Sequence, residues 1–254
     1  HGDAEESGFV RYWVHNGFVN VDSEKMSKSL GNFFTIRDVL KLYHPMAMRW
    51  FLLTTQYRAP VNYSSQALDE ASLRLYYVCQ SLSDAGAELD SAGALGQAAR
   101  AKAAAASGSS LVLLAAITAL LDDLNTPAAL SELSSPLKAI NDLLTTKAGR
   151  KQPDRLEVLA TQHQGVASVL GLLGMFPEVT ELPVLLTEMR RLALVRLGMT
   201  EEEVQAALEA RAQARASKDF AASDTIRQSL ALKGIAILDT PTGSTWRPSA
   251  PTLA

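Results

Sequence analysis

The pentapeptide Lys25-Met26-Ser27-Lys28-Ser29 is the part of this sequence best suited to chemistry. Its two lysines stand three residues apart in a serine-rich loop that ends at a glycine, so both ammonium groups can converge on neighbouring phosphates of one nucleotide. When a carboxylate attacks the α-phosphate of ATP, negative charge builds on the departing pyrophosphate, and cations that grip it in the transition state lower the barrier. Taken alone, however, the pentapeptide is better interpreted as an ordinary solvated Lys/Ser loop.

The composition describes a globular chain with room for one large or two to three small folding units. Of its 254 residues 47% are hydrophobic and 20% charged, and the net charge of −3 gives no overall attraction to a polyanion, although a local basic face stays compatible with one. The longest apolar stretches, 111–121 and 184–197, are too short or too interrupted to span a bilayer, so we expect no membrane partner. The single cysteine, Cys79, predicts a buried apolar side chain. Because the chain opens at His1 without a leader, we interpret it as a fragment.

Two short strands and a short helix are predicted near the N-terminus. The pair Asn16-Gly17 is typical of a tight hairpin turn, and its flanks are rich in aromatic and β-branched residues. The strands are expected at 9–15 and 18–22. Thr35 and Asp38 form a capping-box pattern, which predicts a helix that starts there and ends at His44.

Helical patterns dominate the rest of the chain. Segment 84–110 is rich in Ala, Gly and Ser and poor in large apolar residues, so we expect a mobile linker or a frayed, exposed helix there. Thr126 with Pro127 predicts an N-cap and first helical position. Thr200 starts another capping box, and a strand, a turn and a second strand close the chain after Gly234. The helices are predicted at 46–55, 65–82, 111–124, 127–147, 154–173, 182–197, 201–215 and 220–232.

Several ordered blocks of the sequence resemble the cysteinyl-tRNA synthetases, class I synthetases that carry the KMSKS loop. Segment 122–127 (DDLNTP) is similar to a motif of the family's helical bundle, with Leu124 where an aromatic residue is usual. Segments 57–58 and 62–64 resemble its stem-contact region. The other similar blocks are 12–18, 24–33, 214–220, 224–227, 234–235, 238–239 and 243–246. Blocks in this order over most of the chain are far more specific than one pentapeptide.

The resemblance implies roles for the loop residues. It makes Lys28 the best ATP contact and gives Lys25 a supporting role, so these two are the predicted catalytic residues. Met26, Ser27 and Ser29 complete the predicted ATP-binding set. The two serines can instead serve as local caps within the loop.

The resemblance also implies that Arg215, Phe220, Asp224 and Asp239 read the tRNA anticodon. These residue types suit single-stranded RNA, because an aromatic ring can stack on a splayed base while carboxylates accept from, and an arginine donates to, its Watson–Crick edge. Two alternatives stay open. Phe220 can be a helix core residue, and Asp224 can form a surface ion pair with Arg227.

Three arginines and one tryptophan are further candidates. Arg49, Arg58 and Arg74 can face the tRNA acceptor stem or inner corner, where phosphate contacts position the RNA without specifying its sequence. Trp246 is expected to pack the C-terminal tail rather than to touch RNA. No residue is predicted as a metal ligand.

The implied fold is mainly α. It comprises the end of a Rossmann-type catalytic domain with the KMSKS loop, a helical stem-contact region, a linker, an antiparallel bundle like the DALR anticodon-binding domain, and a small α/β anticodon-binding tail. The corresponding boundaries are 1–34, 35–83, 84–110, 111–199 and 200–254.

The resemblance further implies ATP with Mg2+, cysteine and tRNA-Cys as substrates, in the cytoplasm or in an organelle. Zinc is implied for the full-length parent, with its ligands outside this chain, so we expect the chain to be inactive without the missing N-terminal catalytic half, supplied in cis or in trans. The alternative is a non-catalytic tRNA-binding module. A related cysteine ligase that makes small thiols is a third possibility, against which the anticodon-like tail argues.

Overall fold

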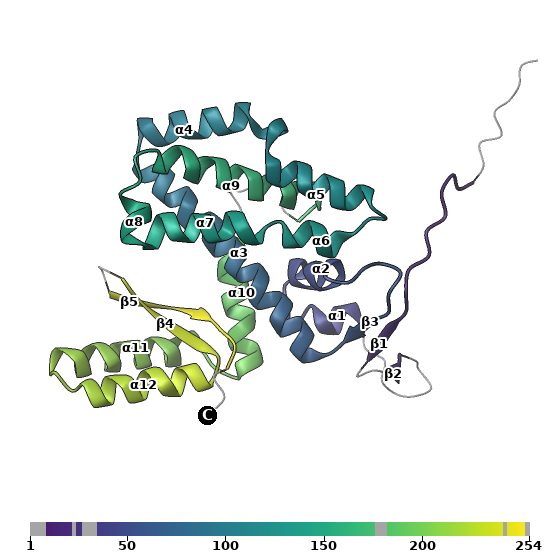
Figure 1. The fold of residues 1–254 in the computed structure, drawn as a ribbon. Helices are drawn as coiled ribbons and strands as arrows, with labels where there is room; N and C mark the ends of the chain where they lie inside the picture. Colours follow the sequence, from purple (N-terminus) through teal and green to yellow (C-terminus); the bar gives the residue numbers. More distant parts are fainter. Residues whose placement is uncertain (1–8, 22–23, 27–34, 176–181, 241–242, 252–254) are drawn as a thin grey trace, which may run out of the picture.

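The computed structural model describes residues 9–21, 24–26, 35–175, 182–240 and 243–251, and within them the protein is mainly helical. Figure 1 shows three regions: a small sheet with short helices, a bundle of longer helices, and a tail in which two helices pack against a hairpin. The predicted mainly α architecture is therefore confirmed. In the described part, no helix combines the length and apolar character needed to cross a membrane.

The N-terminal sheet contains β1 (Val19–Val21), β2 (Glu24–Lys25) and β3 (Val61–Tyr63) in the order β2-β1-β3. β1 pairs antiparallel with β2 and parallel with β3, so the prediction of a strand at 9–15 is wrong. Gly17 allows two backbone segments to approach each other closely and does not form a hairpin turn. Its N–H donates to the Tyr57 carbonyl at 2.7 Å, and an added Cβ would lie only 2.2 Å from the Ala59 oxygen.

Two short helices follow, α1 (Ile36–Val39) and α2 (Pro45–Leu53). The predicted capping box is confirmed, because the Thr35 hydroxyl accepts from the Asp38 N–H and the Asp38 carboxylate accepts from the Thr35 N–H. His44 caps α2, with its Nδ1 accepting from the Met46 N–H at 3.1 Å.

The alanine-rich segment is largely helical, so of the two alternatives expected for 84–110 the structure has the helix, with many exposed positions, and not the mobile linker. Helix α3 (Ser65–Ser91) continues into it, and α4 (Ala94–Ala105) follows after Gly93, whose φ of 57° suits glycine. An added Cβ on Gly96 would lie 1.8 Å from the Leu89 carbonyl oxygen, while Ala99 and Ala103 are buried. The small side chains thus allow α4 to lie close to its neighbours.

The bundle continues with α5 (Leu111–Leu121), α6 (Thr126–Ser131), α7 (Ser134–Thr145), α8 (Lys147–Arg150) and α9 (Arg155–Leu172), after a 3-10 turn at Ser107–Ser109. The single helix predicted at 127–147 is therefore divided. Asn125, rather than Thr126, caps α6, because its side chain accepts from the Ala128 N–H at 3.1 Å. Cys79 is fully buried as predicted, and burial raises the pKa of its thiol to about 12.

The tail follows α10 (Leu182–Leu197) and contains α11 (Glu201–Ala216), α12 (Phe220–Leu232), β4 (Ile235–Thr240) and β5 (Gly243–Pro248). The two strands form an antiparallel hairpin, and the predicted Thr200 capping box is present. Helix α10 joins both cores. Leu182 and Met189 pack in the bundle core, whereas Leu194 packs with Leu208 and Trp246 in the tail core.

His163 on α9 generates a prediction about stability and pH. Its side chain is buried, and its Nε2 has no hydrogen-bond partner among the residues that the structure describes. Burial, reinforced by the charge of Arg100 and opposed by Asp90, lowers its pKa to about 4 from an ordinary value of 6.5. A histidine that is neutral when folded takes up a proton on unfolding, so the stability of the fold decreases as the pH falls from 6.5 towards 4.

We expect His163→Leu to remove this part of the pH dependence, on the order of 3 kcal/mol between pH 6.5 and 4. Urea unfolding at pH 7, 5.5 and 4.5 measures it. His15→Gln, at an exposed histidine, should keep the wild-type pH profile. Equal pH dependence in wild type and His163→Leu would contradict the assignment.

Candidate nucleic-acid interface

The start of the KMSKS loop is attached to the N-terminal sheet. Lys25 closes β2, where its backbone pairs with Asn20 of β1, and Met26 follows as a half-buried residue. Ser27, Lys28 and Ser29 lie outside the described residues. The predicted ATP contacts therefore stay predictions.

Asp239 at the end of β4 is the centre of a charged cluster in the tail. Arg211 holds its carboxylate with two hydrogen bonds, Nη1 to Oδ1 at 2.7 Å and Nη2 to Oδ2 at 3.1 Å. Arg215 donates to Oδ2 at 2.8 Å, and the Ser244 hydroxyl donates to Oδ1 at 2.9 Å. The Arg211 hydrogen bonds, followed by those of Ser244 and Arg215, hold the pKa of Asp239 well below its usual range. The carboxylate is consequently a fixed anion at any physiological pH.

Arg211 is the functional-site residue that sequence reasoning missed. It is buried beneath the cluster, and its hydrogen bonds to Asp239 raise the pKa of its guanidinium. Arg211 and Arg215 stand four residues apart on α11, so they share one helix face. The four-residue spacing of the two arginines was visible in the sequence. It indicates a site only together with the strand pairing that brings Asp239 beside α11.

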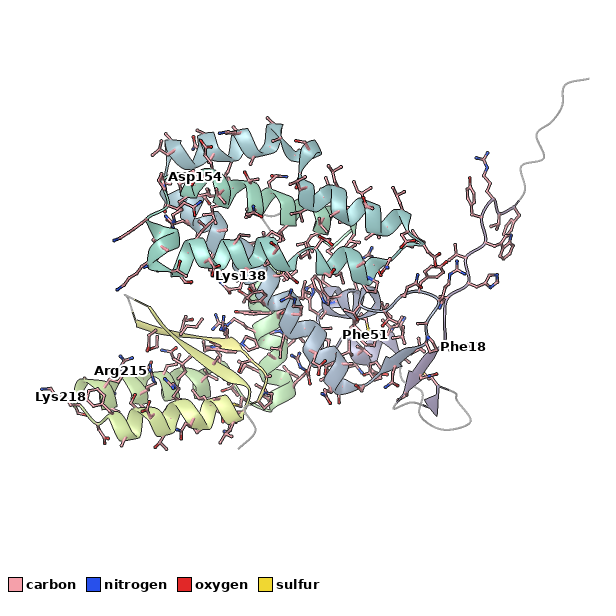
Figure 2. All side chains as sticks on the ribbon, viewed as in Figure 1. Phe18, Phe51, Lys138, Asp154, Arg215 and Lys218 are labelled. Atoms are coloured by element: carbon pink, nitrogen blue, oxygen red, sulfur yellow. The ribbon has the colours of Figure 1, made fainter. Side chains whose placement is uncertain are left out.

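Phe220 and Asp224 lie in the first two turns of α12, which follows α11 after a short turn. The Phe220 side chain is 64% exposed, so the alternative of a helix core residue is wrong. Asp224, one turn further on the same helix, is exposed and its charge contributes to the raised pKa of Arg211. Within the described residues no ion pair joins Asp224 to Arg227. Figure 2 shows Arg215 on α11, near the turn to α12 that lies farthest from α10.

Trp246 packs the tail, as predicted. It is buried, its Nε1 donates to Glu201 Oε1 at 2.9 Å, and the Arg190 guanidinium lies over its ring at 4.3 Å from the centroid. Because Arg190 belongs to α10, this stack ties the hairpin to the helix that also enters the bundle.

The three candidate stem-contact arginines have different surroundings. The side chain of Arg49 donates to the Leu173 carbonyl at 3.1 Å, which ties α2 to the end of α9. Arg58 is exposed and forms an ion pair with Asp123 at 2.8 Å. Arg74 donates to the Ser134 hydroxyl at 3.3 Å and has no carboxylate partner in the part of the chain that is described.

Asp123 joins the stem-contact loop to the bundle. Besides Arg58, the Tyr57 hydroxyl donates to its carboxylate at 2.9 Å and the Gln56 amide donates to its carbonyl oxygen at 2.9 Å. Asp123 and Leu124 both have positive φ, 56° and 54°, an uncommon conformation that the surrounding hydrogen bonds stabilise.

A metal site is not found in the described ranges, which bring no group of three His, Cys, Asp or Glu side chains together. The zinc that the resemblance implies therefore has no candidate ligand set among them.

Three family models match the chain in the order of its regions. The tRNA synthetases class I (C) catalytic domain matches residues 2–73, the DALR domain matches 115–174, and the cysteinyl-tRNA ligase anticodon binding domain matches 199–247. These matches correspond to the sheet with the loop, the bundle and the tail. They define the chain as a class I aminoacyl-tRNA synthetase sequence with a DALR domain.

The matches to curated proteins identify the family more narrowly. A chloroplastic/mitochondrial cysteine–tRNA ligase of Arabidopsis thaliana is 43% identical over 246 residues, which is 97% of this chain and 43% of that protein. The enzyme of the same name from Syntrophotalea carbinolica, without an assigned organelle, is 40% identical over 239 residues, 94% of this chain and 48% of that protein. The chain belongs to the cysteine–tRNA ligase family and spans less than half the length of these relatives.

The charged cluster generates a prediction about the stability of the tail. Asp239→Asn removes the anionic partner of a buried guanidinium, so we expect it to lower the free energy of unfolding by about 1–3 kcal/mol. Arg215→Gln, at the exposed edge of the same cluster, should cost less than about 1 kcal/mol. Urea unfolding followed by circular dichroism measures both. Similar losses in the two variants would show that Arg211 does not depend on Asp239.

Proposed function

We propose that this chain is the tRNA-recognising part of a cysteine–tRNA ligase. The whole enzyme uses ATP to convert cysteine into cysteinyl-AMP and transfers the cysteinyl group to tRNA-Cys. The names of the relatives and the class I and anticodon-binding matches support this function. This chain supplies the KMSKS loop and the tail, and it is inactive without the N-terminal half of the enzyme, in cis or in trans.

The loop acts on ATP. Lys25 and Lys28 bind the β- and γ-phosphates and stabilise the charge of the departing pyrophosphate, and Mg2+ bound to ATP would supply further positive charge there. Met26, Ser27 and Ser29 line the same nucleotide. The backbone pairing of Lys25 with Asn20 supports this assignment, because it ties the start of the loop to the sheet.

The tail reads the anticodon, and the cluster around Asp239 is the observation that carries this proposal. The Asp239 carboxylate is held by Arg211 but stays half exposed, so one side of it and the Arg215 guanidinium can meet a base edge. Phe220 presents an exposed ring for stacking, and Asp224 presents an exposed carboxylate one turn away. A stacking surface beside preorganised donors and acceptors suits an unpaired base of RNA.

Zinc, where the whole enzyme holds it, binds outside the described residues and takes no part in these contacts. We place the enzyme in the cytoplasm. The alternative is an organelle, which the name of the Arabidopsis relative supports.

A non-catalytic tRNA-binding module is the second candidate, supported by the match of residues 199–247 to an anticodon binding domain. This module makes the same RNA contacts as the ligase but does not activate cysteine. Mixing this chain with the N-terminal half of a relative separates the two, because only the first candidate predicts ATP–pyrophosphate exchange that depends on cysteine and is lost in Lys28→Ala.

Anticodon reading predicts a binding preference in this chain alone. Wild type should bind tRNA-Cys more tightly than tRNA-Cys with an altered anticodon, and Asp224→Ala should reduce that preference about 5- to 150-fold, since a lost base contact costs about 1–3 kcal/mol. Fluorescence anisotropy at two salt concentrations measures the affinities.

Gln228→Ala is the matched control, because Gln228 is exposed on the same helix one turn beyond Asp224. It should keep the wild-type preference. Binding without any anticodon preference in wild type would exclude the tail as the reader.

A further inference from the structure

Asp123 of the bundle accepts hydrogen bonds from three consecutive residues of the N-terminal region. The Gln56 amide donates to its carbonyl oxygen at 2.9 Å, and the Tyr57 hydroxyl and the Arg58 guanidinium donate to its carboxylate at 2.9 and 2.8 Å. We call these hydrogen bonds the Asp123 contact. The three donors belong to the part that matches the catalytic domain, whereas Asp123 belongs to the part that matches the DALR domain. The contact therefore joins two domains.

The turn that presents Asp123 has an uncommon backbone. Helix α5 ends at Leu121, and Asp123 and Leu124 follow with φ of 56° and 54°, where glycine is the usual residue after a helix. This turn directs both acceptors of Asp123 towards the loop, because the Gln56 amide lies 2.9 Å from its carbonyl oxygen and 3.3 Å from its Oδ2. An exposed ion pair alone contributes little to stability. The three donors and the strained turn together indicate that the position of Asp123 relative to the loop is fixed.

The loop held by Asp123 is bonded to the sheet that carries Lys25. The Tyr57 carbonyl accepts from the Gly17 N–H at 2.7 Å, just before β1 begins. β1 pairs with β3 on one side and with β2 on the other, and β2 ends at Lys25. A continuous set of backbone hydrogen bonds therefore connects a partner of Asp123 to the first lysine of the KMSKS loop.

Helix α3 provides a second attachment of the sheet to the bundle. Its N-cap, Ser64, directly follows β3, and the helix continues into the bundle core, where Leu82 and Leu89 are buried. The loop 56–58 precedes β3 in the chain, and α3 follows it. The Asp123 contact and α3 thus hold opposite ends of β3, and two attachments fix the orientation of the sheet more firmly than either alone.

We propose that Asp123 is a positioning residue for the transfer of the cysteinyl group to tRNA. It touches neither substrate and acts through the loop 56–58, which sets the orientation of the N-terminal sheet relative to the bundle. This inference rests on the proposed function, in which the tail binds tRNA-Cys while Lys25 and Lys28 act on ATP. It adds the requirement that these two parts of the chain are aligned when their substrates meet.

The transfer step needs this alignment, whereas the activation of cysteine does not. In the transfer, a ribose hydroxyl of tRNA forms an ester bond with the cysteinyl carbonyl carbon, the bond between that carbon and the AMP phosphate oxygen breaks, and the hydroxyl proton passes to the released AMP. Because the tail holds the tRNA, the position of the reacting hydroxyl depends on every joint between the tail and the nucleotide site. A misplacement of about 1 Å can cost a reaction about 100-fold in rate.

The kinetics of the complete enzyme, with the N-terminal half in cis or in trans, test this role. Asp123→Asn keeps the backbone turn, because asparagine also tolerates positive φ, but it removes the charge that Arg58 and Tyr57 bind. We expect kcat for the charging of tRNA-Cys to fall about 10- to 100-fold, while cysteine-dependent ATP–pyrophosphate exchange stays within about 2-fold of wild type. Partial unfolding would instead lower both activities equally. Tyr57→Phe, which removes one hydrogen bond, should show the same split to a smaller extent.

Hydrogen exchange in this chain alone tests the physical link. In Asp123→Asn the Gly17 N–H and the β1 and β3 amides should exchange about 3- to 10-fold faster, because the loop bonded to them is released, while the amides of α7 keep their wild-type rates. Asp122→Asn is the matched control, because Asp122 is an exposed acid one residue earlier in the chain and outside the Asp123 contact. This control should keep the wild-type rates of hydrogen exchange, ATP–pyrophosphate exchange and tRNA charging.

The outcomes separate this inference from the proposed function. Charging at the wild-type rate in Asp123→Asn, or equal losses of activation and charging, would overturn the positioning role and leave the proposed function intact. Unchanged hydrogen exchange at Gly17 would also overturn it, because the loop would then hold the sheet without Asp123. A complete wild-type enzyme that activates no cysteine and charges no tRNA-Cys would overturn the proposed function itself.

Discussion

The packing of α10 is the constraint on which the arrangement of this protein depends. One end of the helix, with Leu182, lies in the bundle core, and Leu194 near the other end lies in the tail core. Arg196 extends the connection to the stem-contact region: its Nε pairs with Asp69 at 2.9 Å, its Nη1 donates to the Leu42 carbonyl at 2.7 Å, and its guanidinium lies over the Tyr43 ring. A single helix thus contacts all three regions, and a change in its orientation would disturb two cores and a partly buried ion pair at once.

This connection fixes the position of the proposed anticodon-reading groups relative to the bundle. The charged cluster around Asp239, which we propose contacts the anticodon, belongs to the tail, and its position relative to the bundle is set by the packing of α10. The stack of Arg190 on Trp246, with Glu201 accepting from the indole, closes the joint between α10 and the hairpin. Rigid placement of this kind lowers the entropy that is lost when a large ligand binds. The groups that we propose to read the anticodon are therefore held in a fixed position relative to the bundle.

The sequence correctly predicted the features that depend on neighbouring residues. Its predictions were wrong where the structure depends on contacts between elements that are distant in the sequence. Thr35 and Thr200 were predicted as caps because a capping box involves residues three apart. The small residues around Gly96 indicated a mobile linker or a frayed, exposed helix, but Gly96 allows α4 to pack closely against the end of α3. Gly17 indicated a hairpin, although the backbone of a distant loop is what requires it. Arg211 was not predicted as a site residue because its partner, Asp239, lies on a strand more than twenty residues away in the sequence.

The fixed arrangement of the bundle and the tail is tested most directly by measuring the distance between them in solution. Spin labels at Ala101→Cys on α4 and Gln213→Cys on α11 occupy exposed positions, and the native Cys79 is buried with a raised thiol pKa, so it should remain unlabelled. Double electron–electron resonance should give one narrow distance distribution in the free protein, unchanged when tRNA-Cys binds. A broad distribution that narrows only with tRNA would contradict the account and show that the RNA, rather than α10, sets the arrangement.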